Sequence, residues 1–155
     1  MKLNIGCGND KRAGYINIDV RSEVNPDLCY DVEKYLLSFF PNDSIDEILA
    51  IDFIEHLSFN KVELFLKDCF RVLKKGGVLK IQIPNLQLHF RNSLDGKYSW
   101  KELSYWIYGG QDNPFNYHKS GFLEHQFIKL LESVGFKVIK KEYIHVNIYF
   151  EAVKP

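Results

Sequence analysis

Short apolar segments that each end at a glycine or an aspartate constrain the fold of this chain most strongly. The segments are 3–5, 15–19, 28–30 and 45–51, and the residues at their ends are Gly6, Asp19, Asp31 and Asp52. Residues 60–73 and 122–134 instead repeat apolar side chains at spacings of three and four, which predicts two helices. Short strands that alternate with helices predict an α/β fold around a mostly parallel sheet.

The second half of the chain predicts how this sheet is completed. Asn60 is the expected N-cap of the first helix, Gly76-Gly77 its expected end, and 78–83 the next strand. Segments 136–143 and 145–152 are joined almost directly, which predicts a hairpin and an antiparallel sheet edge. Residues 85–120 are aromatic, rich in turn formers and too few for a core of their own, so we expect a cap over the site. Residues 1–155 are then one domain.

Composition limits the function classes. The chain has 155 residues, of which 46% are hydrophobic, and 20 basic side chains balance 20 acidic ones. The chain therefore lacks the excess of basic side chains that is typical of nucleic-acid-binding proteins. Three cysteines without paired spacing favour a reducing compartment over a disulfide framework. No apolar stretch has the length of a membrane span or a signal peptide, so we expect a cytoplasmic protein with no membrane partner.

The first glycine loop and the acid after it indicate a ligand site at the strand ends. Ligands of parallel sheets bind outside the carboxyl ends of the strands. Gly6-Cys7-Gly8 is half of a dinucleotide fingerprint, but Asp19 follows Gly8 by only 11 residues, against about 20 in that fingerprint. The first helix is therefore abbreviated or absent, which disfavours a pyrophosphate ligand.

Each of these residues also has a simpler interpretation. Gly6-Cys7-Gly8 can be an ordinary turn after a strand, since short motifs produce false matches. Asp19 can be a solvated carboxylate beside Arg21. Asp31 can be the N-cap of a short helix, a role that is compatible with ligand binding.

An ordered set of motifs resembles one enzyme family. The set comprises Leu3-Asn4-Ile5-Gly6-Cys7-Gly8, the acids Asp19 and Asp31, the turn 41–47, the pair Glu55-His56 and the run 71–77. It is similar to class I S-adenosylmethionine-dependent methyltransferases, and in particular to a small bacterial group of predicted methyltransferases with a shortened first helix. The resemblance covers residues 1 to about 84, and residues 117–122 with the helix after them are similar too. It implies a Rossmann-like fold with a seven-stranded sheet.

The resemblance also implies a site for S-adenosylmethionine. The methionine part would lie over Gly6-Cys7-Gly8 and the ribose on Asp19. The adenine would lie against Val20, Asp31 and Val32, and the methionine amine and the sulfonium near Ile51 and Asp52. Asn4 stands where the family has an acid, so its contact with the methionine ammonium would be weaker.

Two histidines are candidate catalytic residues. His56, after the fourth strand, and His118, at the end of the aromatic segment, could each act as a general base. The alternatives are that His56 only orders the site and that His118 is solvated. His118 and His125 are seven residues apart and no cysteine pairs with them, so the spacing indicates no metal site.

Two further features of the 85–120 segment are ambiguous. Trp100, Tyr105, Trp106 and Tyr108 could line a substrate pocket or a dimer contact, but their spacing is more typical of core packing. Asn113-Pro114-Phe115-Asn116-Tyr117 resembles a signature of methyltransferases that act on amino groups, but it stands far from the fourth strand. We therefore expect a turn there.

The predicted function is methyl transfer from S-adenosylmethionine to a small-molecule acceptor. By analogy with the family, the acceptor could be a sugar in the synthesis of a surface polysaccharide. One alternative is a degenerate domain that binds cofactor weakly and acts as a non-catalytic partner. A nucleotide-dependent oxidoreductase is another, disfavoured by the missing third glycine. A homodimer is compatible with the aromatic segment.

Overall fold

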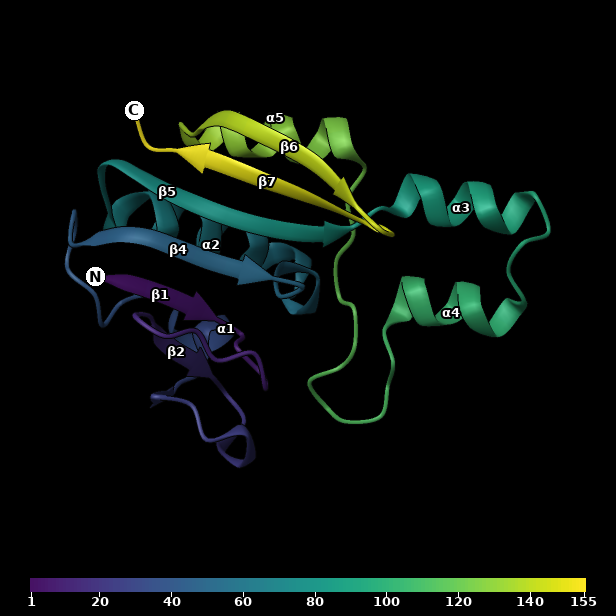
Figure 1. Ribbon diagram of the computed structural model, residues 1–155, viewed down its shortest axis with the longest axis horizontal. Coiled ribbons are helices and arrows are strands. Elements are labelled where there is room, and N and C mark those ends of the chain that lie inside the picture. The colour runs from purple at the N-terminus through teal and green to yellow at the C-terminus, as the bar shows by residue number, and fades with distance from the viewer.

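The computed structural model describes residues 1–155, which form one seven-stranded sheet with the order β3-β2-β1-β4-β5-β7-β6 (Figure 1). The first five strands pair in parallel, and β7 pairs antiparallel with both β5 and β6. The strands are β1 (Lys2–Ile5), β2 (Ile16–Asp19), β3 (Leu28–Cys29), β4 (Ile45–Ile51), β5 (Leu73–Pro84), β6 (Lys137–Ile144) and β7 (Asn147–Val153). The predicted α/β class, parallel sheet and closing hairpin are confirmed.

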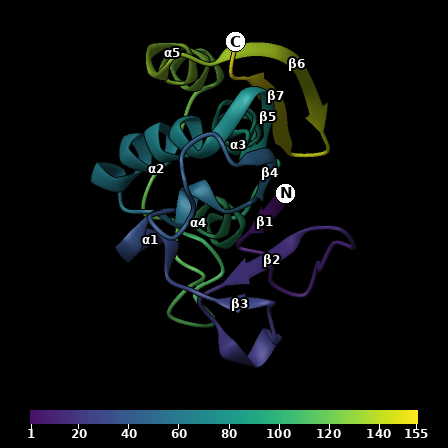
Figure 2. The ribbon, with the colours of Figure 1, turned by 90° about the vertical axis from the view of Figure 1, so that its left-hand side faces the viewer.

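The helices cover one face of the sheet and extend past its end. Helices α1 (Val32–Tyr35), α2 (Phe59–Val72) and α5 (Glu124–Val134) lie on the same side of the strands (Figure 2). Helices α3 (Leu86–Leu94) and α4 (Trp100–Tyr108) lie side by side beyond the end of β5 (Figure 1). Two short 3-10 helices, η1 (Ser22–Val24) and η2 (Ile54–His56), follow β2 and β4. None of the helices is long and apolar enough to cross a membrane.

The opposite face of the sheet has no helical cover because the connection between β1 and β2 contains only turns. The side chains along a strand therefore alternate between the buried face and the polar face of the sheet. In β5, Leu79 and Ile81 are fully buried, whereas Lys80 points away from the core and pairs with Glu47 at 2.9 Å. The abbreviated first helix that the Gly8–Asp19 spacing predicts is thus absent altogether, and a polar sheet face replaces the surface that such a helix would cover.

The core lies between the sheet and α2 with α5. One cluster of 26 buried residues joins the strands to these helices. Phe65, Leu66 and Cys69 of α2 are fully buried, as are Phe127 and Leu131 of α5. This packing fixes β4, and therefore the start of η2, relative to the rest of the sheet.

The predicted ends of the first long helix are wrong. Helix α2 begins after Ser58 rather than at Asn60, and it ends at Val72 rather than at Gly76-Gly77. Leu73 is the reason for the early end, because it pairs with Ile45 and its side chain is fully buried in the sheet. The glycine pair lies within β5, where the Gly76 amide donates to the Lys154 carbonyl and the Gly77 carbonyl accepts from the Lys154 amide.

The expectation that the aromatic cluster of α4 is core is also wrong. No residue of α4 is buried, and Trp100, Tyr105 and Tyr108 are exposed. Trp106 is half-buried and stacks on His89 of α3, with ring centroids 4.4 Å apart. The α3–α4 pair is therefore held by its own contacts and not by the main core.

Two leucines on α2 test this packing. Leu66→Ala should reduce the free energy of unfolding by about 2–5 kcal/mol because it opens a cavity beside the sheet. Leu64→Ala removes the same atoms from a side chain that is 45% exposed, and should cost less than about 1 kcal/mol. Denaturant unfolding measures both. Equal losses would contradict the orientation of α2.

Candidate functional site

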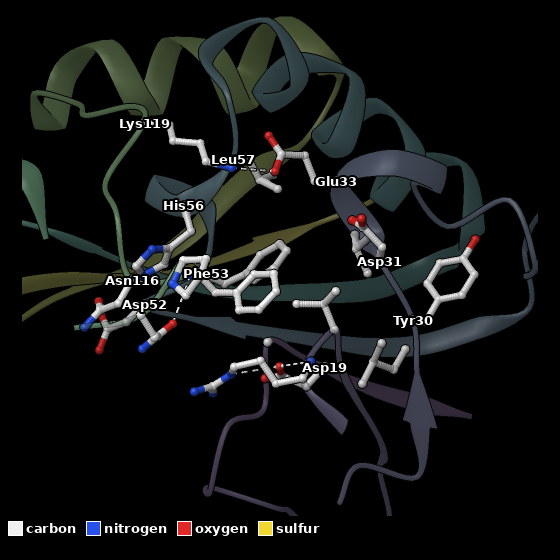
Figure 3. Close-up of a pocket in the computed structure, with 18 of the residues that line it drawn as sticks. Asp19, Tyr30, Asp31, Glu33, Asp52, Phe53, His56, Leu57, Asn116 and Lys119 are labelled. Atoms are coloured by element: carbon white, nitrogen blue, oxygen red, sulfur yellow. Dashed lines mark hydrogen bonds and ion pairs between the residues drawn. The ribbon is translucent and has the colours of Figure 1, made fainter. Parts of the chain in front are cut away.

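The carboxyl ends of β1, β2 and β4 border a cavity of about 440 Å³. Figure 3 shows Asp19 on one side of this cavity, Tyr30 and Asp31 on a second, and Asp52 with His56 on a third. Six of the ten predicted cofactor residues line it, namely Gly6, Asp19, Val20, Asp31, Val32 and Asp52. The volume lies in the range of small-molecule sites, which is about 300–1,000 Å³.

Asp19 ends β2 and is held by backbone groups on both sides. Its Oδ2 accepts a hydrogen bond from the Gly8 amide at 2.8 Å, and its Oδ1 accepts from the Arg21 amide at 2.9 Å. Arg21 Nε also donates to Oδ1 at 3.2 Å. Asp19 is only 6% exposed, so it is not the solvated carboxylate of the simpler interpretation. A carboxylate has about four acceptor sites, which leaves one for a ligand and a second if Arg21 moves.

Asp31 has the capping role that the sequence suggests. Its Oδ1 accepts from the Lys34 amide at 3.0 Å, which fixes the start of α1. Val32 is buried directly after it, and the aromatic ring of Tyr30 precedes it at the cavity wall. One side of the cavity is thus apolar with a single carboxylate at its edge, which suits a flat heteroaromatic ring.

Asp52 follows β4 with a backbone conformation that is uncommon for a residue with a side chain. Its φ is 49°, in the left-handed region. Its Oδ1 accepts from Gln82 at 3.0 Å and from Asn147 at 3.2 Å. Although the residue as a whole is exposed at the cavity, its carboxyl group is enclosed by protein atoms, and this burial raises its pKa. Ile51, one residue earlier, does not line the cavity.

The other predicted cofactor residues shape the loop after β1 from outside the cavity. Asn4 donates to the Asp10 carbonyl at 2.8 Å and to Asn17 Oδ1 at 3.0 Å. Cys7 is buried, which raises the pKa of its thiol. Gly8 contributes its amide to Asp19. Asn4, Cys7 and Gly8 therefore hold the loop in place rather than line the cavity.

Gly6 is required where β1 reaches the cavity. Its φ is +66°, and a Cβ at this position would lie 2.4 Å from Cδ2 of Phe53. Phe53 in turn lines the cavity and packs on Phe65 of α2, with ring centroids 5.4 Å apart. The loop can pass this closely to Phe53 only because residue 6 has no side chain.

The end of the aromatic segment is bound to η2 through hydrogen bonds to backbone carbonyls. The amides of Lys119 and Ser120 both donate to the Glu55 carbonyl, at 2.7 and 3.1 Å. Ser120 Oγ donates to the Ile54 carbonyl at 3.1 Å, and His56 Nδ1 lies 3.0 Å from the Tyr117 carbonyl. These contacts join residues more than 60 positions apart in the chain.

Residues 112–116 and Lys119 form a wall of the cavity. The predicted turn at 113–117 is therefore present in this wall. Lys119 Nζ donates to Glu33 Oε2 of α1 at 2.7 Å, so an ion pair connects the end of the aromatic segment to the α1 side of the cavity (Figure 3). Burial acts to raise the pKa of Glu33, but the bonds from Lys119 and Ser58 outweigh it and lower the pKa.

A second cavity, of about 150 Å³, lies beside the first. Asp52, His56 and Asn116 line both cavities, so the two are adjacent. The two predicted catalytic histidines meet here, with ring centroids 5.0 Å apart, and burial lowers the pKa of both. His118 is half-buried rather than solvated. Glu55 also lines this cavity and is 2% exposed, and burial raises its pKa to about 8.

The charges of the larger cavity favour a cationic ligand. Five carboxylates line it, against the cations of Arg21 and Lys119. Both cations are already paired, with Asp19 and Glu33. The remaining carboxylates, Asp31, Asp52 and Asp112, contact only uncharged or backbone groups. An excess of negative charge attracts a sulfonium and an ammonium and repels a pyrophosphate.

Sequence reasoning missed several residues of these cavities. Tyr30, Glu33, Phe53 and Lys119 line the larger one. Glu55 was noted only as part of a family motif, and its burial gives it a distinct place in the smaller cavity. Tyr30 stands directly before Asp31, and Phe53 directly after Asp52, so adjacency to a strand end was the available signal. No motif or spacing in the sequence indicates the ion pair of Lys119 with Glu33.

Asp19 offers a direct test of the larger cavity. The resemblance implies that Asp19 binds the ribose. Asp19→Asn should then weaken the binding of S-adenosylhomocysteine by about 2 kcal/mol, or about thirtyfold in Kd, because charged hydrogen bonds are lost. Asp10→Asn makes the same change on an exposed carboxylate outside the cavity. Calorimetric titration with S-adenosylhomocysteine should find the same Kd for the Asp10→Asn protein as for the unmodified protein. Equal affinities for Asp19→Asn and the unmodified protein would remove Asp19 from the site.

Gly6 and Gly14 form a matched pair of substitutions, since both have positive φ. Gly14→Ala meets nothing within 4 Å, so it should cost only the backbone strain of about 1–2 kcal/mol. Gly6→Ala should cost more, because Phe53 must move, and it should also weaken ligand binding. Thermal unfolding and calorimetry measure the two effects. A Gly6→Ala protein with the stability and affinity of Gly14→Ala would contradict the close approach to Phe53.

Comparisons with known proteins agree with this fold. Residues 19–81 match the family model described as a methyltransferase domain. A protein of Mycolicibacterium smegmatis described as a probable S-adenosylmethionine-dependent methyltransferase is 30% identical over 99 residues, which are 63% of this chain. The chain spans 31% of the length of that relative.

Two solved structures show the same fold over 99% of this chain. A methyltransferase from Archaeoglobus fulgidus has a TM-score of 0.67 at 17% identity, with 85% of its own chain covered. An N1-methyltransferase of 1,6-didemethyltoxoflavin from Burkholderia thailandensis, solved with that compound and S-adenosylhomocysteine, has a TM-score of 0.64 at 11% identity, with 70% covered. Residues 19–81 are thus similar to a methyltransferase domain, 99 residues are similar to a probable S-adenosylmethionine-dependent methyltransferase, and the chain shares its fold with solved methyltransferases.

Proposed function

We propose that the chain transfers a methyl group from S-adenosylmethionine to a small-molecule acceptor. One observation carries the proposal: an acidic cavity at the ends of β1, β2 and β4 adjoins a second cavity lined by two histidines. The first has the size and charge for a sulfonium nucleoside. The second has room for a small acceptor group, and it adjoins the first at Asp52, His56 and Asn116.

The cavity residues support one orientation of the cofactor. The adenine would lie against Tyr30 and Val32 beside Asp31, and the ribose hydroxyls on Asp19. The methionine part would then extend toward Gly6 and Asp52. This places the donor end of the cofactor at the residues that the two cavities share.

Bound S-adenosylmethionine supplies an activated methyl group and a neutral thioether as leaving group. The protein therefore has mainly to align the acceptor and to exclude water. Lys119 and residues 112–116 form the wall that separates the larger cavity from solvent on the cap side. Asp52, held by Gln82 and Asn147, provides a fixed negative charge beside the transferring group.

His56 and His118 are the proposed catalytic residues on the acceptor side. The Nδ1 of His56 contacts the Tyr117 carbonyl and that of His118 contacts the Trp106 carbonyl, at 3.0 and 3.1 Å. A nitrogen bonded to a carbonyl carries its proton, so the Nε2 atoms are free to interact with an acceptor hydroxyl.

The second cavity supports a polar ring as the acceptor. Tyr105 and Trp106 offer aromatic surface, and Asp52, Asn116 and Asn147 offer hydrogen-bonding groups. Sugars combine apolar ring faces with hydroxyl groups, so a sugar of a surface polysaccharide fits this lining. The three free cysteines support a cytoplasmic location, and the exposed aromatics of α4 support a homodimer contact.

The non-catalytic alternative makes a different prediction about ligands. A degenerate domain that serves as a partner would bind neither S-adenosylmethionine nor S-adenosylhomocysteine. The acidic cavity with an enclosed Asp19 favours the enzyme. Calorimetric titration with both compounds separates the two functions.

His118 tests the acceptor side once an acceptor is found. Sugars and small phenols are incubated with the protein and S-adenosylmethionine, and released S-adenosylhomocysteine is measured by mass spectrometry. With the best acceptor, His118→Gln should lower kcat by about a hundredfold or more. Its affinity for S-adenosylhomocysteine should stay unchanged, because His118 does not line the larger cavity. His125→Gln, on the exposed side of α5, is the control. Unchanged turnover in His118→Gln would leave His118 without a catalytic role.

A further inference from the structure

Glu55, His56 and His118 bring three metal-binding side chains together at the second cavity. One ligand atom from each lies within 4.8 Å of the others. Glu55 and His56 belong to η2, whereas His118 comes from the far end of the cap, 62 residues along the chain. The backbone bonds between residues 117–120 and η2 create this cluster. The sequence does not reveal this cluster, because the spacing of His118 and His125 indicates no metal site.

Both histidines are oriented as metal ligands are. Each Nδ1 lies at hydrogen-bond distance from a backbone carbonyl, Tyr117 for His56 and Trp106 for His118. Metal-binding histidines usually donate one ring N–H to such a carbonyl, which fixes the ring and leaves the other nitrogen as the ligand. Both histidines line the second cavity, and these carbonyl contacts leave the Nε2 atom of each ring available.

Glu55 has a buried oxygen without a partner. Its Oε2 makes no hydrogen bond, and the residue is 2% exposed. A buried polar atom of this kind costs free energy unless something binds it. Glu55 forms no ion pair, and the two cations that line the larger cavity, Arg21 and Lys119, pair with Asp19 and Glu33. A cation in the second cavity would bind the free oxygen.

We propose that Glu55, His56 and His118 bind a divalent transition-metal ion in the second cavity. Two imidazole nitrogens and one carboxylate oxygen form the donor set of catalytic zinc sites, and related iron and cobalt sites use it too. Ligand atoms around a tetrahedral zinc ion lie about 3.4 Å apart, given bonds of about 2.1 Å. The three side chains thus need to shift by about an ångström or less to enclose the ion.

Three protein ligands leave at least one coordination position for an acceptor. The ion would lie in the cavity that shares Asp52, His56 and Asn116 with the proposed cofactor site. A bound transition metal lowers the pKa of a coordinated hydroxyl, so the histidines would activate the acceptor through the ion. This link to the acceptor rests on the proposed methyl transfer, whereas metal binding by the three residues does not.

Cobalt(II) is the probe for the site, because its visible absorption reports the ligands around it. The untagged full-length protein is treated with EDTA, dialysed, and titrated with CoCl₂ without any cofactor. We expect one ion per chain, a Kd in the micromolar range or tighter, and d–d absorption typical of four or five nitrogen and oxygen ligands. A thiolate charge-transfer band would mean that a cysteine binds the ion, and would overturn the proposal.

Matched variants assign the ligands. Glu55→Gln and His118→Gln should each weaken cobalt binding by about a hundredfold or more and remove the absorption. His125→Gln, which changes an exposed histidine of α5, should bind like the unmodified protein. Circular dichroism establishes that each variant is folded. If Glu55→Gln does not fold, His118→Gln together with the spectrum of the unmodified protein decides the question.

Two further outcomes would overturn the site: binding no tighter than millimolar in the unmodified protein, or equal affinity in the His118→Gln and His125→Gln proteins. Titration of the same samples with S-adenosylhomocysteine distinguishes this failure from failure of the proposed function. Cofactor binding without metal binding would reject only the metal site. Metal binding without cofactor binding would reject the methyl transfer and keep the metal site.

Discussion

Parallel pairing of β4 with both β1 and β5 is the constraint on which the rest of the structure depends. It places the carboxyl ends of the strands at one edge, where Gly6, Asp19 and Asp52 meet although they are distant in the chain. Each of these residues is then fixed by a contact that the sheet makes available. Asp19 accepts a hydrogen bond from the Gly8 amide, and Asp52 accepts one from the Gln82 side chain of β5. The backbone of Gly6 lies close to the Phe53 ring. The cavity is therefore a consequence of strand register more than of any single loop.

The backbone bonds between residues 117–120 and η2 add the second half of the site. Helices α3 and α4 lie beyond the sheet and contribute no fully buried hydrophobic residue to its core, so these bonds and the Lys119–Glu33 ion pair determine where the cap meets the domain. They bring His118 beside His56 and leave Glu55 enclosed. These contacts thus define a wall of the larger cavity and also bring Glu55, His56 and His118 together at the smaller one.

The sequence predicted what short-range patterns encode. Apolar segments ending at Gly6, Asp19 and Asp52 located the strand ends, and the short Gly8–Asp19 interval predicted the missing first helix. Leu73 misled the prediction of α2 because its apolar side chain fits the helix pattern equally well, and only its pairing with Ile45 assigns it to β5. Contacts over long intervals, such as His118 with His56 or Lys119 with Glu33, have no periodic signal. For that reason the proposed metal site of Glu55, His56 and His118 emerges only from the fold.

A crystal structure of the protein grown with S-adenosylhomocysteine tests the central claim most directly. We expect one molecule in the 440 Å³ cavity, with its ribose on Asp19, its adenine between Tyr30 and Val32, and its sulfur facing the His56 side. The cap should remain bound to η2 as it is here. Density for the ligand at another place, or an empty cavity at saturating ligand concentration, would contradict the assignment of this edge of the sheet as the cofactor site.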